Sequence, residues 1–124
     1  MHCKNLFLRN HKGNKHYLVI FECNHELSIH ELEKQLKQGK LTFASAQRLM
    51  NYLGVEAGSI SPFALINDKE KHVHIFIDEN LKNADRISFH PNANTASLVI
   101  FNSDFIRFLD YTGNSYEHIK LYSN

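Results

Sequence analysis

The chain has 124 residues, of which 43% are hydrophobic and 22% charged, and this is the composition of one globular domain rather than a disordered chain or a coiled coil. Its formal net charge of +1 argues against the strongly basic face of a dedicated nucleic-acid binder, although it allows one small basic patch. No apolar run approaches the roughly 20 residues of a membrane span, and two cysteines make no disulfide framework, so we expect a cytoplasmic protein without a membrane partner.

The first third of the chain predicts a β-hairpin followed by a helix. Residues 4–9 and 16–22 are rich in apolar side chains, and a glycine-containing turn separates them, which favours two antiparallel strands. Ser28 and Glu31 have the spacing of a capping box, so a helix should begin there and end near Gln38.

The middle of the chain predicts a short extended piece, a second helix and two further strands. Ser45 is placed to cap the helix, and Gly54 is placed to end it. A loop over residues 57–62 follows this helix. The extended piece is expected at residues 41–43, and the strands at residues 63–66 and 73–77.

The last third predicts strands around one more helix, which Ser103 should cap and Gly113 should end. The expected strands are residues 86–89, 96–101 and 118–121. Strands therefore dominate, and hairpins join most of them. This pattern indicates a single α+β domain over residues 1–124, with a mixed, largely antiparallel sheet and about three helices.

No standard catalytic signature is present, so the candidate site residues come from unusual segments. Lys4 begins an apolar strand, where its ammonium could meet a carbonyl or phosphate oxygen, and the alternative is a solvated lysine at a strand end. His90 precedes Pro91 and is suited to orient a hydroxyl, shuttle a proton or bind phosphate, unless it is simply a hydrogen-bonded residue at a strand end. Asn94 either touches substrate or caps its own turn.

The second candidate segment is a loop, referred to below as the 58–62 loop: Gly58, Ser59, Ile60, Ser61 and Pro62. Glycine lets the backbone approach a ligand closely, and proline stiffens the exit from the loop. The N–H groups between them are therefore placed to hold an ester carbonyl or its developing oxyanion. An ordinary connection between a helix and a strand is the alternative.

Zinc-type ligands occur at one end of the predicted hairpin, namely His2, Cys3, Cys23 and His25. Their spacing matches no zinc pattern, so we predict no metal site. His72 and His74 lie two residues apart on one face of a predicted strand, and we expect both to face solvent.

Several short segments are modest alone but specific in their order and spacing. They are CKNLFLR from Cys3, LTFAS from Leu41, RLMNYLGV from Arg48, GSISPFALIND from Gly58, ISFHPNAN from Ile87, and the helix over residues 105–109. Together they cover nearly the whole chain and resemble the YbaK / prolyl-tRNA synthetase-associated editing domain family, most closely its free-standing prolyl-tRNA deacylases. The resemblance implies a curved mixed sheet.

The resemblance also implies an activity, which is hydrolysis of the ester between a wrong amino acid and the 3′-terminal adenosine of tRNA(Pro). Lys4 falls on the family's active-site lysine, and His90 falls on the pocket histidine of this branch. Asn5 falls on a position that contacts the substrate end, and Gly58 and Pro62 fall on the family's Gly-x-x-x-Pro loop, whose backbone holds the aminoacyl group. Family members need no cofactor or metal and form no covalent intermediate, and the terminal ribose hydroxyl helps to activate the water.

The implied substrate is Ala-tRNA(Pro), edited in trans, because alanine is smaller than proline and a small pocket admits it. The implied partners are the acceptor end of tRNA(Pro) and prolyl-tRNA synthetase. The charges alone leave the residues that touch RNA phosphate open among Arg9, Lys12, Lys15 and Arg48.

One departure from the family concerns the start of the chain. Family members carry a few dozen residues before the segment at Cys3, and these wall the amino-acid pocket, so we expect a weakened specificity and an uncovered sheet edge that favours a homodimer. Two alternatives remain: a weak or inactive paralogue that binds tRNA or a synthetase, and a deacylase for another misacylated tRNA such as Cys-tRNA(Pro). The editing interpretation requires the Lys4 ammonium and the amides of the 58–62 loop to converge on one aminoacyl carbonyl.

Overall fold

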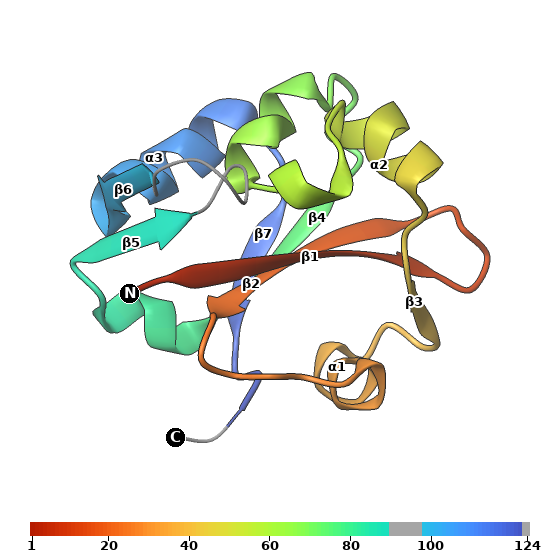
Figure 1. Cartoon of the computed structure of the whole chain (residues 1–124), viewed down its shortest axis with the longest axis horizontal. Coiled ribbons are helices and arrows are strands. Elements are labelled where there is room, and N and C mark those ends of the chain that lie inside the picture. Colours follow the sequence, from red (N-terminus) through yellow and green to blue (C-terminus); the bar gives the residue numbers. More distant parts are fainter. Residues whose placement is uncertain (90–97, 123–124) are drawn as a thin grey trace.

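The computed structural model describes residues 1–89 and 98–122, which form a five-stranded sheet, a separate two-stranded hairpin and three α-helices (Figure 1). The strands are β1 (Cys3–Asn10), β2 (His16–Glu22), β3 (Leu41–Phe43), β4 (His74–Asp78), β5 (Arg86–Phe89), β6 (Leu98–Phe101) and β7 (Tyr116–Ile119). The helices are α1 (Ile29–Leu36), α2 (Ala46–Leu53) and α3 (Asn102–Thr112), with 3-10 segments η1 (Ala57–Ser59), η2 (Pro62–Asn67) and η3 (Glu79–Asn83).

The five-stranded sheet has the order β3-β1-β2-β4-β7. β1 pairs antiparallel with β2 and β3, whereas β4 runs parallel to both β2 and β7. The second sheet is the antiparallel hairpin of β5 and β6. The predicted α+β class with a mixed, largely antiparallel sheet is therefore confirmed.

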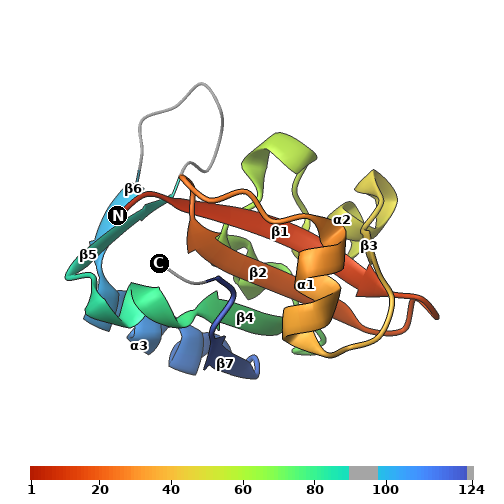
Figure 2. The ribbon, with the colours of Figure 1, turned by 90° about the horizontal axis from the view of Figure 1, so that it is seen from below.

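Helices cover both faces of the sheet, and α1 lies on the face opposite to α2 and α3 (Figures 1 and 2). The strand β2 is buried along nearly its whole length because both faces around it are covered. On the side of α2 and α3, its Leu18 and Ile20 join a large apolar cluster with Phe89 and Phe105. On the side of α1, Val19 and Phe21 belong to a second cluster with Leu32.

The local signals at the first two helices are confirmed. Ser28 Oγ accepts a hydrogen bond from the Glu31 N–H, and the Glu31 carboxylate accepts one from the Ser28 N–H, which completes the predicted capping box at α1. Ser45 Oγ caps α2, and Gly54 ends it with φ +67°, a conformation that glycine adopts without steric cost.

Two expected boundaries and one element type are wrong. Residues 63–66 lie in η2 rather than in a strand, because Pro62 occupies the first helical position and Ser61 Oγ accepts from the Phe63 N–H, both of which favour a helix start. α3 begins at Asn102, whose side chain bonds the Leu81 carbonyl, and no side chain caps it, so Ser103 is not the cap. The last strand covers Tyr116–Ile119 rather than residues 118–121, since its register follows β4.

No helix among residues 1–89 and 98–122 is both long enough and apolar enough to cross a membrane. The longest helix, α3, has 11 residues.

A buried histidine joins α2 to the hairpin of β1 and β2. His16 is 1% exposed, and its Nε2 lies 3.2 Å from Arg48 Nη1. Because a guanidinium only donates, this Nε2 accepts, and Nδ1 carries the proton that is donated to His72 Nε2 at 2.9 Å. His72 is thus half-buried against His16, and His74 bonds Ser115, so the expectation that both histidines face solvent is wrong.

Acid should destabilise the protein through His16. Burial is the largest cause that lowers the pKa of His16 from 6.5 to about 4, and the neighbouring His72 and Arg48 side chains act in the same direction. The unfolded chain therefore binds the proton first, and stability is lost as the pH falls from about 6.5 towards 4. We expect the free energy of unfolding in urea to be lower by about 2 kcal/mol at pH 5 than at pH 7.5 through this group alone.

The control for this prediction is His11, which is exposed in the turn between β1 and β2. His11→Gln should leave the pH dependence intact, whereas His16→Gln should flatten it between pH 7.5 and 5. An unchanged slope in His16→Gln would show that other groups cause the acid sensitivity.

Candidate functional site

The first half of β1 has a strand on only one side in the described part of the chain. β3 pairs with Leu8, Arg9 and Asn10, and the Ala44 N–H just after β3 donates to the Phe7 carbonyl, so the backbone before Phe7 extends beyond this strand. At the very start of β1, a single parallel bridge joins His2 to Ser88 in β5. The intervening stretch, which contains Lys4 and Asn5, is referred to below as the open edge of β1.

Lys4 and Asn5 point to opposite faces of the sheet, because side chains alternate along a strand. Lys4 is paired with Phe21 in the register of β1 and β2, and its Nζ lies 5.7 Å from the centroid of the Phe21 ring. Phe21 belongs to the apolar cluster under α1, so the Lys4 side chain lies on the α1 face. Asn5 lies on the other face, together with Cys3 and Phe7 of the cluster under α2 and α3.

Asn5 contains a polar atom that the fold leaves without a partner. Its Oδ1 is buried, and no hydrogen-bond partner for it exists among the described residues. A buried amide oxygen without a partner is unusual in folded proteins and destabilising. A bound molecule that donates a hydrogen bond at this point would remove the deficit.

The 58–62 loop lies on the same face as Asn5, where Ile60 packs against the cluster that contains Cys3 and Phe7. Two of its polar groups serve the loop itself, since the Ser59 N–H donates to Glu56 O at 2.9 Å and Ser61 Oγ accepts from the Phe63 N–H. The N–H groups of Ile60 and Ser61 make no hydrogen bond to any described residue. Two consecutive amide donors are therefore available to an oxyanion.

The fold does not require a glycine at position 58. Its φ lies outside the left-handed range, and a Cβ built there would meet no atom within 4 Å. The space above Gly58 is thus open with respect to residues 1–89 and 98–122. A glycine that neither conformation nor packing demands leaves room for a ligand to approach the backbone.

The exit of the 58–62 loop lies next to the end of β5. The ring of Phe63 meets the ring of Phe89 edge to face, with centroids 5.8 Å apart. Phe89 is the last described residue before the predicted site residues His90 and Asn94, which lie outside the described residues. The structure thus brings Asn5, the loop and the end of β5 to one face of the sheet, and it places the Lys4 side chain on the other.

The other sequence candidates have different surroundings. Burial raises the pKa of the Cys3 thiol to about 12, so this residue is no nucleophile at neutral pH. Across the described ranges, no three His, Cys, Asp or Glu side chains gather as metal ligands; His2 contacts Ser88, and His25 stacks on Tyr122. Arg48 donates to the Gly13 carbonyl and lies against His16, so it braces the hairpin.

Comparison with known proteins gives a consistent family. Residues 2–108 match the family model of the aminoacyl-tRNA editing domain. The chain is 36% identical to the prolyl-tRNA editing protein ProX of Acetoanaerobium sticklandii, over 95% of this chain and 72% of that protein. It is 31% identical to the prolyl-tRNA synthetase associated domain-containing protein 1 of Bos taurus, over 91% of this chain and 68% of that protein.

Solved structures support the same fold. A protein described as a candidate trans-editing enzyme for prolyl tRNA synthetase superposes with a TM-score of 0.67 at 19% identity, over 96% of this chain and 69% of its own. The hypothetical protein APE2540 superposes with a TM-score of 0.66 at 18% identity, over 94% of this chain and 72% of its own. The chain belongs to the aminoacyl-tRNA editing domain family.

Proposed function

We propose that the protein hydrolyses the aminoacyl ester of mischarged tRNA(Pro), with Ala-tRNA(Pro) as its main substrate, and so edits in trans in the cytoplasm. Family membership and the similarity to ProX support an editing role on prolyl-tRNA. The observation that carries the proposal is the pair of amides at Ile60 and Ser61, which bond no described residue and lie beside Gly58, where a Cβ would meet no described atom within 4 Å. An ester carbonyl seated there would find two donors for the negative charge that develops during hydrolysis.

In this proposal water attacks the carbonyl carbon, the carbonyl oxygen becomes an oxyanion, and the amides of Ile60 and Ser61 stabilise it. The bond between the carbonyl carbon and the ribose oxygen then breaks. The ribose oxygen takes up a proton derived from the water, so that the free amino acid and an intact tRNA end are the products. Such an ester is already activated, and positioning with oxyanion stabilisation is enough catalysis without a covalent intermediate.

The remaining site residues have positioning and electrostatic roles. Asn5 Oδ1 accepts a hydrogen bond from the bound substrate end, which satisfies the buried atom. Lys4 has a flexible four-carbon stem, and we propose that its ammonium turns around the open edge of β1 to reach the ester. His90 follows Phe89 directly in sequence and carries the proton between water and the ribose oxygen, while Asn94 contacts the substrate.

The experiment that tests the proposal is a panel of charged tRNAs. Alanine release from Ala-tRNA(Pro) should exceed the uncatalysed rate by far, whereas Pro-tRNA(Pro) should stay charged. Faster release of cysteine from Cys-tRNA(Pro) would transfer the assignment to that substrate. Tight binding of tRNA(Pro) or of prolyl-tRNA synthetase without hydrolysis of any ester would show that the protein is a binding protein and not an enzyme.

Gly58→Ala separates the function of the loop from its folding. The added methyl group meets open space in the protein alone, so the free energy of unfolding should change by less than about 0.5 kcal/mol. It would intrude on a bound ester, and a displaced ester should react about 10- to 100-fold more slowly. Deacylation under single-turnover conditions measures the effect.

Gly39→Ala is the matched control, because its Cβ also meets nothing within 4 Å but its φ of +78° disfavours alanine. This variant should lose about 1 kcal/mol of stability and keep its activity. Equal activity of Gly58→Ala and the parent protein would show that no substrate approaches the loop at this residue.

A further inference from the structure

An exposed aromatic ring with a cation over its face lies at the base of the hairpin of β5 and β6. Phe101 is the last residue of β6, and it is 52% exposed. Arg86 pairs with Phe101 across the hairpin, and its guanidinium carbon lies 5.1 Å from the ring centroid. We call these two side chains the Arg86–Phe101 platform.

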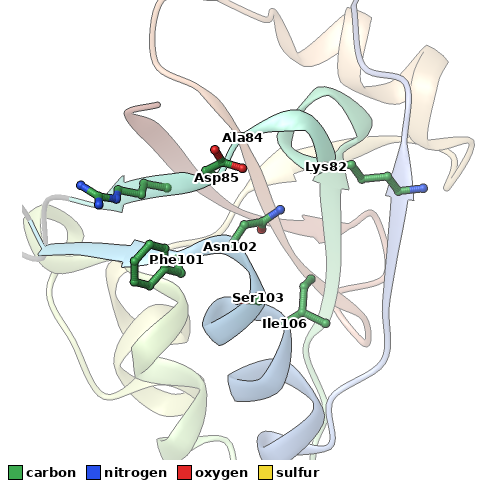
Figure 3. A pocket seen from close by; sticks show the side chains of 8 residues that line it. Lys82, Ala84, Asp85, Phe101, Asn102, Ser103 and Ile106 are labelled. Carbon is green, nitrogen blue, oxygen red and sulfur yellow. The ribbon is translucent and has the colours of Figure 1, made fainter.

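The platform borders a cavity of about 580 Å³ between η3, the hairpin and the first turn of α3 (Figure 3). Its lining residues are Lys82, Ala84, Asp85, Arg86, Phe101, Asn102, Ser103 and Ile106. In Figure 3 the Phe101 ring lies beside the hollow, whereas the Lys82 side chain points away from it. Cavities of a few hundred Å³ accommodate small planar ligands.

The charges around the platform are mixed. Arg86 and Arg107 carry positive charge, and Asp85 and Asp104 carry negative charge. Asp104 is paired with Arg107 at 3.6 Å, which leaves Arg86 against Asp85, since Lys82 points away from the cavity. The Asp85 carboxylate repels phosphate but accepts hydrogen bonds from base amino groups or ribose hydroxyls.

The platform and the candidate editing site are connected through β5 and β1, which lie side by side at one point. β5 runs parallel to β1 at the bridge between His2 and Ser88. Arg86 lies two residues before Ser88, and Lys4 lies two residues after His2. At roughly 3.3 Å per residue, the platform is therefore about 13 Å from the open edge of β1, a distance that the nucleotides just before a terminal adenosine can span.

We propose that the Arg86–Phe101 platform stacks one base of the single-stranded 3′ end of the tRNA substrate, with the Arg86 guanidinium beside an adjoining phosphate. Bases of single-stranded RNA stack on exposed aromatic rings and arginine planes, and such a local contact is compatible with a chain of net charge +1. This inference rests on the proposed function for the identity of the RNA. The assignment of the ring as a base platform rests on its exposure and its cation.

The test compares affinities for uncharged tRNA(Pro) and for a short oligoribonucleotide that ends in CCA. Phe101→Ala should weaken both by about 5- to 100-fold, and Arg86→Ala should weaken them and reduce their salt dependence. Phe101→Tyr should restore binding, because a phenol ring stacks equally well. The matched control is Phe43→Ala, which removes a ring that is 55% exposed on β3 and should change neither affinity.

Binding and turnover keep this inference distinguishable from the proposed function. If no ester is hydrolysed but Phe101→Ala still weakens RNA binding, the RNA-binding role of the platform is supported and the proposed deacylase activity is rejected. If Ala-tRNA(Pro) is hydrolysed and Phe101→Ala changes neither the affinity nor KM, the platform is overturned. Loss of a dimer in Phe101→Ala at unchanged RNA affinity, seen by light scattering, would likewise overturn it in favour of a second copy of the chain.

Discussion

Replacement of Lys4 by methionine should slow deacylation of Ala-tRNA(Pro) by about 100- to 1000-fold, the usual consequence of losing one group that stabilises a developing oxyanion. Methionine keeps the apolar packing on Phe21 and removes only the charge. The contact between the ammonium and the ring contributes less than about 1 kcal/mol at such a site, so the fold should persist. Single-turnover rates at saturating protein measure the effect without interference from binding.

Lys34→Met is the control for this loss, because Lys34 is an exposed lysine of α1. Its rate should equal that of the parent protein. Full activity of Lys4→Met would mean that the ammonium stays on the α1 face during the reaction. The editing site would then consist of Asn5 and the 58–62 loop without the lysine.

Asp68→Ala should lower the free energy of unfolding by about 3–5 kcal/mol, the range for removing one partner from a buried charged network. Asp68 is 4% exposed at the end of η2. Its Oδ1 accepts from the His72 N–H at 3.1 Å, and its Oδ2 accepts from the Val73 N–H and from Asn114 Nδ2, both at 2.8 Å. Alanine would leave the buried Val73 N–H and the partly buried His72 N–H without an acceptor, and Asn114 Nδ2 would keep only its bond to the Val73 carbonyl.

Urea unfolding at pH 7.5 measures this loss, and Glu70→Ala is the control. Glu70 is exposed two residues further along the same turn, and its removal should cost less than about 0.5 kcal/mol. The loss of unfolding free energy in Asp68→Asn should lie between those of Asp68→Ala and Glu70→Ala. The amide oxygen of asparagine still accepts a hydrogen bond, whereas its NH₂ group would face N–H donors. A loss below about 1 kcal/mol in Asp68→Ala would show that water replaces the carboxylate.

The elements that could be predicted from sequence are those whose causes are local. The hairpin of β1 and β2, the capping box at Ser28 and the glycine that ends α2 each depend on neighbours within a few residues. The start of η2 is also local, since Ser61 and Pro62 form a helix start, but four apolar residues after them suggested a strand. Short apolar runs do not distinguish the two states by periodicity.

The candidate site was only partly accessible from sequence, because its arrangement depends on tertiary contacts. Alternation along β1 implies that Lys4 and Asn5 face opposite ways, but only the clusters show which face receives the loop. Asn5 Oδ1 and the amides of Ile60 and Ser61 have no hydrogen-bond partner within the described ranges, and this depends on the positions of segments distant in sequence. His72 was expected in solvent because its partner, His16, is 56 residues away.

The central claim is that the Lys4 ammonium and the amides of the 58–62 loop converge on one aminoacyl carbonyl. A nuclear magnetic resonance titration tests this claim most directly. The probe is alanyl-adenosine in which an amide replaces the labile ester, added to protein labelled with ¹⁵N. We predict that the backbone amides of Ile60 and Ser61 and the side-chain amide of Asn5 shift together in the parent protein, and that the Lys4 ammonium resonance shifts with them. Saturable binding that moves other resonances and leaves Ile60, Ser61 and Lys4 unchanged would contradict the account.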